Sequence, residues 1–105
     1  MNIVMLYITF PNEAEAKQIG ETIVQEKLAA CCNIISNNAT SIYFWKGAIN
    51  RDTETIMIAK TSENKVKELT DRIIKLHSYD IPCVVVLPIK SGNNEFIDWV
   101  KSEVT

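Results

Sequence analysis

Residue types on which many catalytic sites depend are scarce in this chain of 105 residues, which has one histidine, three glycines and three prolines. With so few glycines, and with no G-x-G-x-x-G or P-loop spacing, we do not expect a loop that cradles phosphates. No G-x-S-x-G or H-E-x-x-H motif occurs either. These absences indicate a protein that is not an enzyme and that requires no cofactor.

The chain also has no large excess of charge of one sign and no long apolar run. The formal net charge is -2 and the pI is about 5.4, so no basic field attracts nucleic acid. The apolar runs at residues 3–10 and 81–89 are far shorter than the roughly 18–20 residues that span a bilayer. Because no signal-peptide pattern occurs, we expect a cytoplasmic protein. The chain is expected to form one domain over residues 1–105, with neither nucleic acid nor a membrane as partner.

Cysteine is present but does not suggest a disulfide framework. The three residues Cys31, Cys32 and Cys83 are an odd number. If Cys31 and Cys32 lie on a strand, their side chains point to opposite faces and cannot share one metal ion. Two interpretations remain open for the three cysteines: small apolar residues in a reducing compartment, or a metal or redox role.

Hydrophobic periodicity predicts a chain that alternates strands and helices. Asn12 and Glu15 form the pattern of a helix start. Lys46-Gly47 predicts a hairpin turn. In chain order we expect a strand at 3–10, a helix at 13–30, one strand with an irregular break or two short strands at 31–46, a strand at 53–61, a helix that ends near residue 77, a strand at 81–89, and a closing helix.

This order, β-α-β-β-α-β plus a C-terminal helix, predicts an α+β fold of the ferredoxin-like, split βαβ type. Helices on one face of such a sheet leave its other face uncovered. The segments 3–10 and 81–89 nevertheless show no polar alternation, so both of their faces should be buried. We therefore expect a homo-oligomer in which sheets pack against each other.

A few polar and aromatic residues are candidates for function. His77, the only histidine, lies at a predicted helix end near Asp80, either as a capping residue or as a ligand at a subunit edge. Glu54 and Lys60 share one strand face, where they could line a polar pocket or form an ion pair. Three consecutive rings, Tyr43 to Trp45, could stack on RNA, but without adjacent basic residues burial at a hairpin or interface is favoured.

Several segments together resemble the CutA divalent-cation tolerance family, in order and spacing over nearly the whole chain. They are EKLAACCNII at 26–35, SIYFWKG at 41–47, Glu54 with Lys60-Thr61, HSYDIP at 77–82, and LPI…GN at 87–93. The resemblance implies a ferredoxin-like subunit that forms a tight homotrimer similar to PII signalling proteins.

The same resemblance implies ligand-binding clefts between subunits. In some family members copper is attributed to a first-strand cysteine and a histidine pair, where this chain has Ile8 and Leu76-His77. Only His77 remains as a candidate metal ligand, which Asp80 or Cys83 could join across a threefold assembly. The residues that correspond to the family's cleft are Tyr43, Trp45, Glu54, Lys60, His77, Tyr79 and Asp80.

We therefore expect a trimeric protein of divalent-cation (copper) tolerance. It would bind Cu²⁺, another divalent cation or a small anion weakly at its inter-subunit clefts, in a binding or signalling role. The alternative is a structural or protein-interaction trimer with no metal chemistry of its own.

Overall fold

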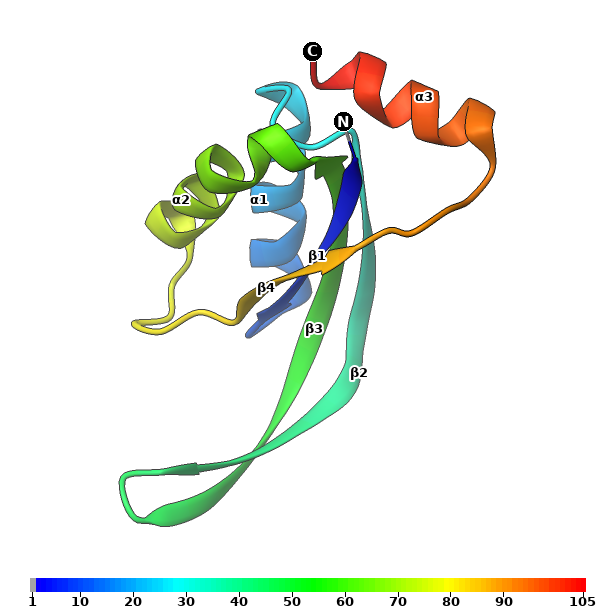
Figure 1. Ribbon diagram of the computed structural model, residues 1–105. Coiled ribbons are helices and arrows are strands. Elements are labelled where there is room, and N and C mark those ends of the chain that lie inside the picture. The colour runs from blue at the N-terminus through cyan, green and yellow to red at the C-terminus, as the bar shows by residue number, and fades with distance from the viewer. Residues whose placement is uncertain (1) are drawn as a thin grey trace.

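Four strands form one antiparallel sheet in the order β2-β3-β1-β4, accompanied by three α-helices (Figure 1). This computed structural model describes residues 2–105. The expected order of elements is confirmed. The elements are β1 (Ile3–Phe10), α1 (Glu13–Gln25), β2 (Cys31–Trp45), β3 (Ala48–Ser62), a 3-10 turn (Glu63–Lys65), α2 (Val66–Leu76), β4 (Val84–Pro88) and α3 (Asn94–Glu103).

The main core lies between the sheet and helices α1 and α2. Leu6 and Ile8 of β1 are fully buried there against Ile23 of α1 and Ile73 of α2. A second, smaller cluster holds α3, through Val100 and other residues, against the start of β1. In the described part of the chain, no helix is both long and apolar enough to cross a membrane.

Helix α1 begins as expected but ends earlier. The Asn12 side chain accepts a hydrogen bond from the Glu15 amide at 2.8 Å, which caps the helix. The helix ends at Gln25 instead of Ala30, because Lys27 adopts a left-handed conformation with φ 63°. Lys27 and Leu28 then donate to the Val24 and Ile23 carbonyls, a Schellman pattern. Glycine is usual at this left-handed position, so a lysine there gave no warning of the helix end.

Strands β2 and β3 form a long hairpin whose outer part, residues 39–54, we call the hairpin arm. The two strands pair up to Trp45 and Ala48, so β3 begins at residue 48 and not at residue 53 as expected. Both turn residues, Lys46 and Gly47, have positive φ, as a type I′ hairpin requires. The arm extends beyond the other strands in Figure 1 and contributes to a radius of gyration of 14.3 Å, against about 13 Å for a compact domain of this size.

The region expected at 31–46 is one strand with an irregular break. Pairing with β3 shifts between Ile35 and Ala39, and Asn37 there has a φ of 52°. The Asn37 amide donates to the Thr55 hydroxyl, which in turn donates to the Asn37 side-chain oxygen, both at 3.3 Å. The last strand is shorter than the expected 81–89, because β4 pairs with β1 only from Val84 to Pro88.

The face of the sheet opposite α1 and α2 is apolar as well. Tyr7 pairs with Ile58 on one side and Val85 on the other, so all three share this face. Val85 is 49% exposed and Leu87 is 43% exposed. In one subunit, the expectation that both faces are buried is met on the helix side of β1, but Val86 on the same side of β4 is 42% exposed.

The Asn12 cap yields a test of this local structure. We expect Asn12→Ala to lower the free energy of unfolding by about 1 kcal/mol, because the Glu15 amide loses its acceptor. Urea denaturation at a fixed chain concentration measures the change. Asn12→Asp retains a capping oxygen and should stay close to the original protein. Equal losses in both variants would contradict the capping role.

Candidate functional site

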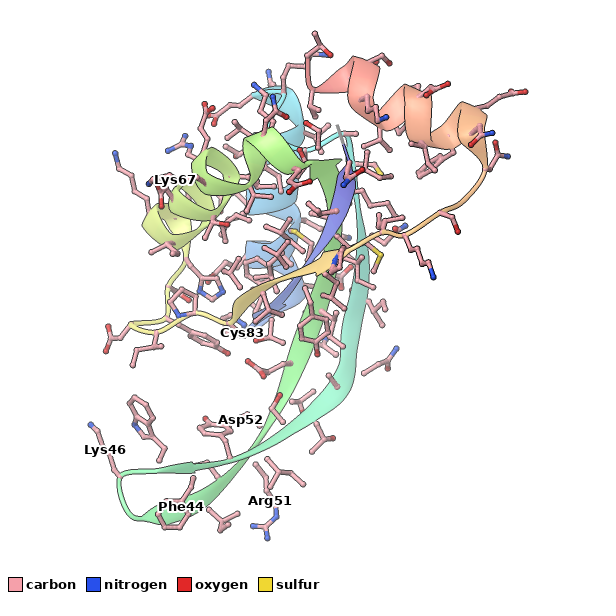
Figure 2. All side chains as sticks on the ribbon, in the orientation of Figure 1. Phe44, Lys46, Arg51, Asp52, Lys67 and Cys83 are labelled. Carbon is pink, nitrogen blue, oxygen red and sulfur yellow. The ribbon has the colours of Figure 1, made fainter. Side chains whose placement is uncertain are left out.

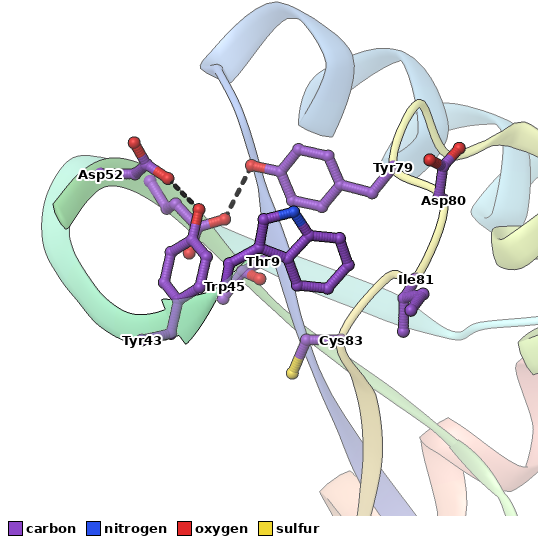
Figure 3. A pocket seen from close by; sticks show the side chains of 9 residues that line it. Thr9, Tyr43, Trp45, Asp52, Tyr79, Asp80, Ile81 and Cys83 are labelled. Atoms are coloured by element: carbon purple, nitrogen blue, oxygen red, sulfur yellow. Dashed lines mark hydrogen bonds between the residues drawn. The ribbon is translucent and has the colours of Figure 1, made fainter. Parts of the chain in front are cut away.

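A pocket of about 360 Å³ lies between the hairpin arm and the connection from α2 to β4 (Figure 3). The arm contributes Tyr43 and Trp45, and the connection contributes Tyr79 and Ile81. Thr9, at the end of β1, joins them. The site is therefore assembled from three parts of the chain that are distant in sequence.

Glu54 forms hydrogen bonds with two of these segments. Its side chain is buried, with 7% of the residue exposed. One carboxylate oxygen accepts a hydrogen bond from the Tyr79 hydroxyl at 2.7 Å, and the other accepts one from the Ser41 hydroxyl. Since Ser41 belongs to β2 and Tyr79 to the connection, the carboxylate of Glu54 holds the arm and the connection at the same pocket.

A second pair on the arm, Asp52 and Tyr43, repeats this arrangement. The Tyr43 hydroxyl donates to the Asp52 carboxylate. This hydrogen bond raises the pKa of Tyr43, and burial together with the hydrogen bond to Glu54 raises the pKa of Tyr79. Both phenols therefore stay protonated at neutral pH and act as donors to the carboxylates.

The charge of the pocket has one sign. Three carboxylates line it, those of Asp52, Glu54 and Asp80, and none of the lysines, arginines or histidine among residues 2–105 does. The arrangement attracts a cation and disfavours the small anion that the sequence left open.

The structure brings most of the expected cleft residues together. Tyr43, Trp45, Glu54, Tyr79 and Asp80 all line the pocket. Of the three consecutive rings, that of Phe44 points away, with 68% of the residue exposed near the outer end of the arm (Figure 2).

Lys60 does not join this group. It shares a strand face with Glu54, as its spacing predicts, but six residues of strand separate the two by about 20 Å. Its ammonium group donates to the Asn33 side chain at 2.8 Å. The expectation that Lys60 lines the same pocket or pairs with Glu54 is therefore wrong for this subunit.

His77 lies behind the pocket and not in it. Its ring is stacked on Phe10 with 4.6 Å between the ring centroids. The Nε2 atom lies 2.8 Å from the Thr9 carbonyl oxygen, and the Tyr79 amide donates to Nδ1 at 3.1 Å. This pattern fits a neutral ring with its proton on Nε2. Both ring nitrogens are thus engaged, and His77 positions Thr9 and Tyr79 instead of offering a free metal ligand.

The acidic neighbour of His77 is Glu15, not Asp80 as the sequence suggested. The Glu15 carboxylate accepts from the Ser78 amide at 3.1 Å and lies 3.5 Å from His77 Nδ1. Glu15 therefore links the first turn of α1 to the start of the connection that forms one wall of the pocket.

The cysteines take separate positions. Cys32 packs against the core near Gly20, while Cys31 next to it on β2 has its side chain on the other face. Cys83 lines the pocket. Burial raises the pKa of the Cys32 and Cys83 thiols, which reduces the thiolate that a soft metal would require. Within residues 2–105, no three histidine, cysteine or acidic side chains are grouped to hold a metal ion.

Sequence reasoning missed three lining residues, Thr9, Asp52 and Ile81, and considered Cys83 only as a metal ligand shared between subunits. A signal existed for Asp52, because it lies two residues before Glu54 and therefore on the same strand face. No local pattern marked Thr9, whose place in the pocket depends on pairing between distant strands.

Comparisons with known proteins give a consistent result. The profile of the CutA1 divalent ion tolerance protein family matches residues 4–103. The rice protein CutA 1, chloroplastic, is 39% identical over 99 residues, which are 94% of this chain and 55% of the rice protein. The divalent-cation tolerance protein CutA of Thermus thermophilus is 40% identical over 97 residues, 92% of this chain and 93% of that protein.

A solved structure agrees with these sequence matches. The periplasmic divalent cation tolerance protein CutA from Archaeoglobus fulgidus superposes with a TM-score of 0.94 at 39% identity, over 98% of this chain and 99% of that one. The chain spans only about half the length of the plant and human relatives that it matches.

Titration of the tyrosines tests the hydrogen bonds of the pocket. We expect Tyr43 and Tyr79 to ionise above the ordinary phenol pKa of about 10, and Glu54→Gln to lower the pKa of Tyr79, since an amide does not repel the phenolate. Tyrosinate absorbance in the near ultraviolet measures this, and Tyr79→Phe identifies which step is Tyr79.

The sign of the linked stability change follows from the raised pKa. The contribution of Tyr79 to stability is complete below pH about 10 and is lost as the pH rises through the folded-state pKa. A titration of Tyr79 that is identical in the original protein and in Glu54→Gln would disprove the proposed contact.

Proposed function

The chain belongs to the CutA1 divalent ion tolerance family, and from this premise we propose that it is a homotrimeric binding protein of divalent-cation tolerance whose pocket takes up a cation. The role is one of binding or signalling and not of catalysis. The observation that carries the proposal is the charge of the pocket, which is lined by three carboxylates and, within the described part of the chain, by no basic side chain.

The carboxylates also suggest how strongly a divalent ion such as Cu²⁺ would bind. Asp52 and Glu54 lie two residues apart on one face of the arm, and each already accepts hydrogen bonds from hydroxyl groups. Cu²⁺ prefers about four nitrogen and oxygen ligands in a square-planar or tetragonal arrangement, so two carboxylates from one subunit support weak binding only. In this proposal His77 is a positioning residue and not the metal ligand that we expected from the sequence.

The open sheet face supports the trimer. Tyr7, Ile58 and Val85 lie side by side on the face opposite α1 and α2. Half-exposed apolar side chains over a whole sheet face favour a partner, and a second copy of the same chain provides a matching apolar surface. The strand order β2-β3-β1-β4 agrees with a ferredoxin-like subunit, from which we propose a PII-like trimer.

An alternative is an interaction trimer without metal chemistry. Phe96 and Trp99 of α3 form an exposed pair of rings, 5.7 Å between centroids, and such pairs are common in protein interfaces. Co-purification of a protein partner that survives treatment with a chelator would favour this alternative. A cytoplasmic location is part of our proposal for this chain, although relatives include proteins named as chloroplastic and periplasmic.

Calorimetric titration with Cu²⁺ and with Zn²⁺ tests cation binding. We expect weak binding by the original protein and at least about a tenfold loss in Glu54→Gln, because the site loses one of its charges. Glu68→Gln, an exposed position on α2, is the matched control and should bind normally. Equal affinity in all three proteins would remove the pocket from the function.

Mass measurement in dilute solution tests the assembly. We expect three times the 11.9 kDa of one chain. Val85→Asp should shift the protein toward monomer, because it places a charge on the open sheet face. Ile74→Asp is a matched control, since Ile74 is 48% exposed and Val85 49%, but Ile74 lies on α2. A stable monomer of the original chain would refute the trimer.

A further inference from the structure

The pocket combines two kinds of surface. In Figure 3, the carboxylate of Asp52 and the hydroxyl of Tyr43 lie on one side, and Ile81 lies on the other. The indole of Trp45 lies between them in this view. A ligand that fills the pocket therefore meets both charge and hydrocarbon.

A bare metal ion uses only part of these surfaces. Its ligands would come from Asp52 and Glu54, since no larger group of metal-binding side chains exists among residues 2–105. The volume of about 360 Å³ falls within the range of about 300–1,000 Å³ that is usual for sites of small organic molecules. An ion alone would leave the apolar surfaces of Trp45 and Ile81 in the pocket unused.

The carboxylates of Glu54 and Asp52 can accept further hydrogen bonds. A carboxylate accepts at about four lone-pair positions. Glu54 receives two hydroxyl hydrogen bonds and Asp52 receives one, which leaves free acceptor positions on both. An ammonium group carries positive charge and up to three N–H donors, so it matches these positions. An anion would be repelled, and an uncharged ligand would leave the carboxylates without a counter-charge.

The rings favour the same kind of ligand. A cation held over the face of tryptophan or tyrosine within about 6 Å of the ring centre is attracted by the ring's quadrupole, tryptophan most strongly. Trp45, Tyr43 and Tyr79 all line the pocket. The Trp45 side chain and Ile81 also provide apolar surface for the carbon skeleton of the ligand.

We propose that the pocket binds a small organic ammonium ion. Its charged nitrogen lies at Glu54 and Asp52, and its hydrocarbon part lies against Trp45 and Ile81. The inference rests on the proposed function, since it names the class of cation that the same pocket prefers. It goes further in requiring the aromatic side of the pocket, which divalent-cation binding does not require.

Fluorescence titration with a matched set of probes tests this preference. The chain has two tryptophans, so Trp99→Phe on α3 leaves Trp45 as the only reporter. We expect 2-phenylethylammonium to change the emission of Trp45 saturably. The uncharged analogue 2-phenylethanol and the anion phenylacetate should bind at least tenfold more weakly. Equal binding of the ammonium probe and the alcohol would overturn the proposal.

Variants in the same background separate the two surfaces. Glu54→Gln, which keeps the shape of the side chain, should weaken binding of 2-phenylethylammonium at least tenfold. Trp45→Leu, followed by calorimetry because the reporter is lost, should also weaken binding at least tenfold. Glu68→Gln should have no effect. Unchanged affinity in both Glu54→Gln and Trp45→Leu would place the probe elsewhere and would refute the proposal.

The Cu²⁺ and Zn²⁺ titrations keep the two hypotheses distinguishable. If the divalent ions bind in a Glu54-dependent manner and 2-phenylethylammonium does not bind, the organic ligand is refuted and the proposed function stands. If neither class of cation binds, both are refuted. Trp45→Leu should weaken binding of the ammonium probe more than it weakens binding of the divalent ions, and an equal loss for both cations would contradict a separate aromatic contribution.

Discussion

The alternation of side chains along β1 is the constraint on which the fold and the pocket both depend. β1 lies between β3 and β4 and pairs with β3 along its whole length. Leu6 and Ile8 point toward α1 and α2, and a slip of one residue would turn them to the opposite face. The same alternation directs Thr9 to the other face, where it lines the pocket. Packing of the core thus also places one part of the site.

The pocket in turn depends on side-chain contacts that cross between elements. Glu54 accepts hydrogen bonds from Ser41 on the neighbouring strand and from Tyr79 on the connection. His77, behind the pocket, holds Thr9 and the Tyr79 backbone. A buried carboxylate is costly unless such donors satisfy it. The polar network therefore supports the position of the connection as well as the charge of the pocket.

The sequence predicted the order of the elements, and five of the nine pocket residues are among those that the family resemblance implied for a cleft. Apolar runs and the Asn12 cap are local signals, and each was confirmed in the structure. The end of α1 was not predictable, because Lys27 adopts a backbone conformation usually reserved for glycine. Lys60 lies apart from Glu54 within one subunit, because shared strand parity gives the face of a side chain but not its distance from another residue. The role of His77 required contacts with β1 that no spacing reveals.

The irregular segment between Ile35 and Ala39 has a consequence for how such chains can change in evolution. Ile35 pairs with Ile56, and the next pair is Ala39 with Glu54. Between these two pairs β2 therefore advances by four residues while β3 moves by only two. The difference is even, and the two faces of the arm therefore remain in phase with those of the sheet. A change of one residue here would leave an odd difference, which the pairing with β3 can absorb only through a β-bulge that bends the strand and increases its twist. The length of this segment therefore influences the direction of the arm, and with it the position of Trp45 at the pocket.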